Sequence, residues 1–120
     1  LEGKGTLTAV RGFAEYFLAE IILDADRGSC LMASTAIEVG RADPEIQTVV
    51  KTYFGRVEAA IHAVLANAME AGQIAEDRDL RALARHLVNA LHGLGIMGRA
   101  GHSRPALRQM LNGALSVLEK

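Results

Sequence analysis

The chain has 120 residues, half of them hydrophobic, and a formal net charge of −1 at neutral pH. Phosphate binding relies on clustered Lys and Arg, and no cluster of five basic residues exists here, so direct nucleic-acid binding by this chain is not expected. No apolar run approaches the roughly 18 residues that a membrane span requires. The size predicts one domain, and the single Cys30 excludes an internal disulfide, which fits a cytoplasmic location.

Alanine, leucine, glutamate and arginine are abundant, whereas β-branched and aromatic residues are sparse, so an all-α fold class is favoured. Residues 1–5 lack an initiating Met and contain Gly3 and Gly5, and we interpret them as a linker remnant or a tag. From Thr6 to about Ile22, apolar residues at three-and-four spacing predict the first helix. Ser29 is a plausible cap for a short second helix that runs to about Glu38.

The stretch from Asp43 to Ala71 predicts the longest helix, about 40 Å at 1.5 Å per residue. Asp43 can accept a hydrogen bond from a free first-turn amide, and Pro44 suits the first helical position because its missing N–H costs nothing there. Gly72 predicts where this helix ends. A stripe of this length is too long for one short partner, so several helices are expected to pack along it.

A fourth helix is expected from a cap at Asp79 to Ala100 and Gly101, and a fifth from a cap at Ser103. Each has a leucine stripe, and the fourth has a second line at helical spacing, formed by His86, Asn89, Ala90, Gly93 and Met97. Glycines inside a helix cost about 1 kcal/mol each against alanine. Those of the fourth helix indicate either fraying near Gly101 or the close approach of another backbone.

The second of these interpretations predicts a dimer seam. The fourth and fifth helices of two subunits would then form an intersubunit four-helix bundle. The candidate interface residues are His86, Ala90, Gly93, Met97, Met110, Leu111, Ala114 and Leu118.

Residues 77–87, followed by 91–94 and 99–101, resemble the closing half of the regulatory domain of TetR/AcrR-family transcriptional repressors. Residues 30–32, 36–39 and 43–45 resemble the middle of the same domain. Ser29 and Ser34 stand where such relatives usually have glycine and asparagine.

The resemblance implies a five-helix regulatory domain that forms a homodimer through its last two helices and binds a small, often hydrophobic effector between the others. Family members carry an N-terminal helix-turn-helix module, which cannot be read in these residues. DNA is therefore expected to be a partner only through a domain absent from this chain.

An effector pocket is expected where bulky residues of three helices converge and where polar atoms on apolar faces need partners. The candidate ligand-binding residues are Phe13, Phe17, Met32, Thr35, Tyr53, Phe54, His86 and Asn89. Aromatic residues at helical spacing also serve as ordinary core, and a backbone carbonyl or water can also satisfy the polar atoms.

Two other classes stay open. One is a helical homodimerisation module without a pocket. The other is a metal-containing bundle enzyme, for which Glu58 and His62 have the spacing that places two ligands on one helix face. The matching motif on a facing helix is missing, so neither a metal nor another cofactor nor a catalytic residue is expected, and a solvated surface contact explains this pair better.

Overall fold

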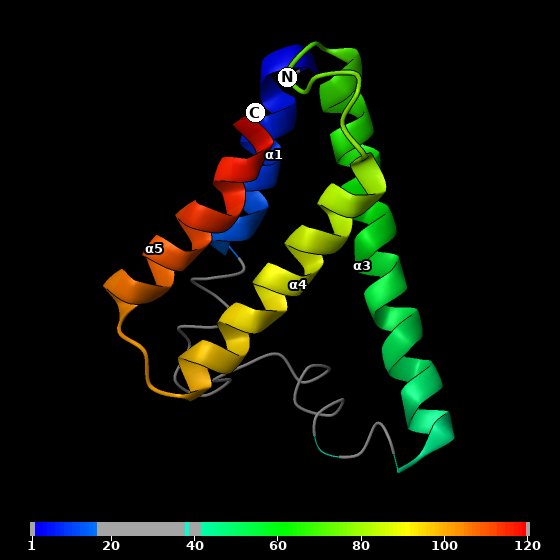
Figure 1. The fold of residues 1–120 in the computed structure, drawn as a ribbon, viewed down its shortest axis with the longest axis vertical. Coiled ribbons are helices and arrows are strands. Elements are labelled where there is room, and N and C mark those ends of the chain that lie inside the picture. Colours follow the sequence, from blue (N-terminus) through cyan, green and yellow to red (C-terminus); the bar gives the residue numbers. More distant parts are fainter. Residues whose placement is uncertain (1, 17–37, 39–41, 120) are drawn as a thin grey trace.

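The computed structural model describes residues 2–16, 38 and 42–119. This part of the chain is helical with connecting turns and contains no strand (Figure 1). Its elements are α1 (Glu2–Tyr16), α3 (Pro44–Glu70), α4 (Leu80–Arg99), α5 (Arg104–Leu115) and the 3-10 helix η2 (Ser116–Glu119). The predicted all-α class is confirmed, whereas the predicted second helix lies almost wholly outside the described residues. No described helix is both long and apolar enough to cross a membrane.

Helix α3 has the ends that the sequence predicts. The Asp43 carboxylate accepts hydrogen bonds from the backbone N–H groups of Glu45, at 3.0 Å, and Ile46, at 3.3 Å. At the other end Gly72 has a φ of +82°, and the N–H of Gln73 reaches back to the carbonyl of Ala68 at 2.9 Å. This left-handed closing turn is the Schellman motif, in which glycine avoids the steric cost of a Cβ.

The same local signals delimit α4 and α5. Asp79 accepts from the Ala82 N–H at 3.1 Å, and Ser103 accepts from the Ala106 N–H at 3.2 Å, so both predicted caps are confirmed. Gly101, at a φ of +96°, closes α4.

Helix α1 already begins at Glu2, four residues before the predicted start at Thr6. Once a helix has formed, extension adds one hydrogen bond per residue, which can offset the low helix propensity of Gly3 and Gly5.

The four described α-helices surround one hydrophobic core. α3 packs against α1 and α4, α4 packs against α5, and α5 is joined to α1 by the Arg108–Glu15 ion pair and by an Arg11–Asn112 hydrogen bond of 3.3 Å. In Figure 1, α4 and α5 run in opposite directions, as do α1 and α3. The largest fully buried side chains are Leu65, Ile74, Leu107 and Leu111.

The loop between α3 and α4 is tied to both ends of the described chain. Ile74 is buried in the core. The side-chain oxygen of Gln73 accepts from the backbone N–H of Leu7 in α1 at 3.1 Å. Arg78 donates to the carbonyl of Val117 in η2 at 2.8 Å. The loop therefore fixes the position of the first turns of α1 and of the end of the chain relative to α3.

Candidate functional site

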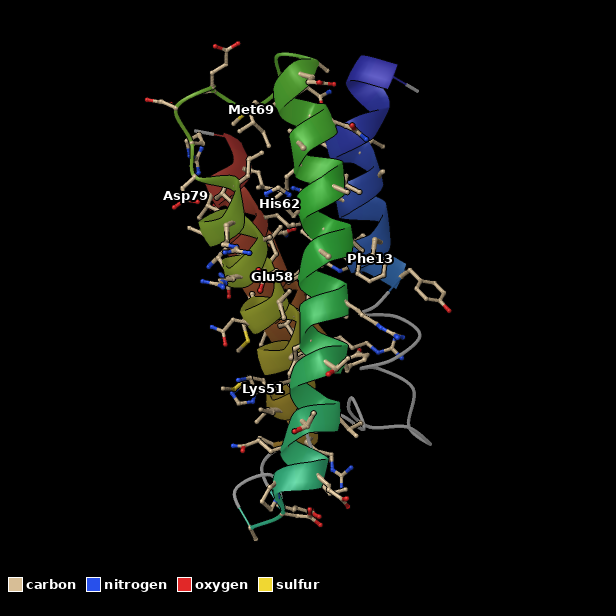
Figure 2. The ribbon with its side chains drawn as sticks, turned by 90° about the vertical axis from the view of Figure 1, so that its right-hand side faces the viewer. Phe13, Lys51, Glu58, His62, Met69 and Asp79 are labelled. Carbon is tan, nitrogen blue, oxygen red and sulfur yellow. The ribbon has the colours of Figure 1, made fainter. Side chains whose placement is uncertain are left out.

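A cavity of about 570 Å³ lies between α1, α3, α4 and α5. Its size is in the range of small-molecule sites, which are usually concave and mostly apolar. Figure 2 shows Phe13, one of its lining residues, beside the middle of α3. The lining residues are Ala9, Val10, Phe13, Ala14, Tyr53, Arg56, Val57, Ala60, Ile61, Val64, Leu87, Ala90, Leu91, Leu111, Ala114 and Leu115.

Helix α3 supplies a continuous wall of this cavity. Its lining residues recur every three or four positions from Tyr53 to Val64, which corresponds to roughly 16 Å along the helix axis. Tyr53 and Arg56 lie at one end of this wall, and they are the polar side chains among the described lining residues. The cavity is therefore a hydrocarbon-lined space with its polar groups gathered at one end.

Tyr53 also belongs to a ring cluster that connects α3 to α4. Its ring centroid lies 5.3 Å from that of Phe54 and 5.8 Å from that of His92, and Phe54 and His92 are 4.8 Å apart, all edge to face. Edge-to-face packing is the geometry that aromatic quadrupoles prefer. The cluster therefore holds the cavity wall of α3 firmly against α4.

Hydrogen bonds assign the tautomer of the buried His92. Its Nδ1 lies 2.8 Å from the carbonyl oxygen of Val88, which can only accept, so Nδ1 carries a proton. In the neutral ring Nε2 is then the acceptor, and the Tyr53 hydroxyl, 3.4 Å away, is its donor. One weak hydrogen bond thus joins a cavity-lining residue of α3 to the interior of α4.

Only some of the predicted ligand-binding residues line the cavity. Phe13 and Tyr53 line the cavity, whereas Phe54 packs in the ring cluster behind it. His86 and Asn89 are exposed and do not line the cavity, and His86 instead lies 3.3 Å from the carbonyl of Ala114 through Nε2. The remaining three candidates lie outside the described residues: Phe17, Met32 and Thr35.

Sequence reasoning did not single out Arg56 and His92. His92 follows Ala84 and Val88 at four-residue spacing, so a second buried line of α4 could have been read from the sequence. This line, and not the one through His86 and Asn89, faces α3.

The structure divides the candidate dimer residues into three groups: those with open or exposed surface, those buried in the core, and those that line the cavity. Met97 and Met110 are exposed at 39% and 37%, and an added Cβ on Gly93 meets no described atom within 4 Å. No backbone of the described chain therefore approaches Gly93 closely. Leu111 and Leu118, in contrast, are only 1% and 4% exposed because they fill the core of their own chain. Ala90 and Ala114 line the cavity.

The structure explains the two residues considered for a metal site without a metal ion. Glu58 pairs with Arg85 at 3.3 Å and with Arg81 at 3.7 Å, both on α4, and His62 is exposed. Within the described residues, no three His, Cys, Asp or Glu side chains come together in a way that could hold a metal ion. Glu58 thus helps to fasten α4 to α3.

Comparison with known families decides the relationship. The family model described as "Tetracyclin repressor-like, C-terminal domain" matches residues 6–114. The chain belongs to this family. The match spans nearly the whole sequence, including every cavity-lining residue except Leu115, and it confirms the TetR resemblance. The TetR-like C-terminal domains form a regulatory, non-enzymatic family that typically binds ligands and dimerises. No curated protein and no solved structure matches the chain.

Proposed function

We propose that this chain is the effector-binding and dimerisation domain of a TetR-like transcriptional regulator, and that its cavity binds a small, mostly apolar molecule. The observation that carries the proposal is the cavity of about 570 Å³, whose lining is hydrocarbon except at the end that holds Tyr53 and Arg56. Burial of an apolar ligand there gains free energy from the hydrophobic effect, and the two polar groups set its orientation.

Dimerisation occurs through the outer face of the α4–α5 hairpin, where two hairpins related by a two-fold axis form a four-helix bundle. Met97 of α4 and Met110 of α5 expose apolar surface there, and the open space around Gly93 and Gly113 lets a second backbone come close. Leu111 and Leu118 support this face from the inside, so the proposed interface does not include them.

The Tyr53–His92 hydrogen bond connects the two activities. An effector that forms a hydrogen bond with the Tyr53 hydroxyl competes with His92 for it and so removes one contact between α3 and α4. Helix α4 contributes half of the proposed interface. In a complete regulator, the distance between the two DNA-binding domains must match the spacing of the operator half-sites. A change in dimer geometry therefore changes operator affinity.

Light scattering with a thermal-shift screen of small apolar compounds tests this proposal. A dimer is expected at micromolar concentration, together with an increase in melting temperature of about 10 °C at a ligand concentration near 100 times its Kd. A dimer that no compound stabilises would instead indicate an interaction module without an effector. A strict monomer would contradict the dimerisation half of the proposal.

Replacing Tyr53 by Phe should weaken binding of an effector identified in that screen by about fivefold, because one neutral hydrogen bond contributes roughly 1 kcal/mol. The ring remains, so Phe54 and His92 keep their packing and the protein stays folded. Titration calorimetry and circular dichroism measure the two effects. Unchanged affinity would remove the Tyr53 hydroxyl from the site.

A further inference from the structure

We infer that the effector is an amphipathic carboxylic acid, with its carboxylate at Arg56 and its apolar part along α3. This inference rests on the proposed function and specifies the chemical class of the ligand. Arg56 is the charged member among the described residues that line the cavity, and the remaining lining, except for Tyr53, is hydrocarbon.

Three arginines of the described helices and loops have a guanidinium without a hydrogen bond or ion pair to any described residue, namely Arg56, Arg99 and Arg104, and of these three Arg56 alone lines the cavity. Five arginines of the same region each have a protein partner: Arg11, Arg78, Arg81, Arg85 and Arg108. A guanidinium with five donors at the edge of a cavity is thus available to an acceptor on a ligand.

The position of Arg56 on α3 matches a ligand with two unlike ends. Arg56 lies three residues after Tyr53, so both side chains are on the same helix face about one turn apart. The planar guanidinium can bind a carboxylate through two parallel N–H···O bonds, and the Tyr53 hydroxyl can donate a third by exchanging its hydrogen bond to His92 Nε2 for one to the ligand. Farther along α3 the wall continues with Ala60, Ile61 and Val64, which offer no polar atom to a ligand.

The charge balance favours a carboxylate over a phosphate ester. One cation in the lining neutralises a monoanion, whereas a phosphate near charge −2 would retain uncompensated charge beside an apolar wall, which is costly. Along the wall from Tyr53 to Val64, roughly 16 Å, there is room for an extended aliphatic or aryl tail.

Two probes with the same tail test the inference, namely decanoate and decanol below their micelle concentrations, titrated calorimetrically into the wild type and the Arg56→Gln variant. Decanoate should bind the wild type about tenfold more tightly than decanol, the lower end expected for a charge-assisted hydrogen bond at a partly exposed site. Arg56→Gln should remove this preference by weakening decanoate binding alone. Arg56→Lys should restore part of it, because it keeps the charge but loses the planar fork.

Lys51→Gln is the matched control, since it removes one positive charge from an exposed position of the same helix that does not line the cavity (Figure 2). It should leave both affinities unchanged. Equal binding of the two probes to the wild type, or an equal loss of both in Arg56→Gln, would overturn the acid-group inference and leave the apolar effector cavity intact. Failure of both probes to bind the wild type would overturn the inference together with the effector half of the proposed function.

Discussion

Replacing Met97 by Glu is expected to convert the proposed dimer into a monomer. Met97 is 39% exposed on the outer face of α4, and in a two-fold interface the change occurs twice. Burying a carboxylate without a partner is costly, and two like charges near the axis add repulsion. We expect the dimer dissociation constant to rise at least about 100-fold, which corresponds to roughly 3 kcal/mol. Sedimentation equilibrium over a series of concentrations measures it.

The matched control is Val49→Glu. Val49 is also an exposed apolar residue, at 55%, but it belongs to α3 and not to the α4–α5 hairpin. This variant should remain a dimer. If Met97→Glu remains a dimer too, the seam is not on this face of α4, and the exposed Met110 then needs another explanation.

The second large effect is expected from Val57→Trp. Val57 is partly buried and lies in the middle of the α3 wall of the cavity, between Tyr53 and Ile61. An indole at this position occupies the space that an effector needs, so we expect affinity to fall at least about tenfold. The existing cavity accommodates much of the added volume, so strain from overpacking should stay near the low end of about 1–3 kcal/mol. Calorimetry and thermal melting measure the two quantities.

Val49→Trp makes the same substitution at an exposed position of α3 outside the cavity lining. It should bind effector like the wild type. Both variants should form dimers, because neither position is in the α4–α5 hairpin. If Val57→Trp binds the effector with full affinity, the ligand does not lie along α3, and the proposed site is wrong.

The helix ends were predictable because their signals are local. Asp43, Asp79 and Ser103 each bond to an amide two or three residues ahead, and Gly72 and Gly101 adopt positive φ values. A capping residue can be identified from its neighbours in the sequence, because its hydrogen bonds do not depend on the rest of the chain. The sequence therefore predicted both ends of α3 and α4, and the start of α5, almost to the residue.

The rotation of each helix about its own axis was harder to predict. Both sides of α4 carry small or apolar residues at helical spacing, so periodicity alone did not decide whether His86 or His92 faces α3. The choice depends on long-range packing, in which Phe54 and Tyr53 of α3 close over His92. For the same reason the spacing of residues in α3 did not show that Arg56 borders the cavity.

The leucine stripe of α5 shows the same limit. Leu107, Leu111 and Leu115 were correctly predicted to share a face, but that face turns inward. A helix that already buries one apolar face in its own chain needs a second apolar face to form a dimer interface. On α5 this second face is the short stretch around Met110. Helical spacing identifies which residues lie together and leaves open which neighbour they meet.

The loop that follows α3 has a mechanical consequence. It contacts α1 through Gln73 and η2 through Arg78, and its buried Ile74 anchors it in the core. A rotation of α4 relative to α3 must occur at this loop. Such a rotation displaces the first turns of α1 unless the hydrogen bond between Leu7 and Gln73 breaks. In a longer protein, a segment joined to α1 would then be coupled to the angle between α3 and α4 through one amide side chain.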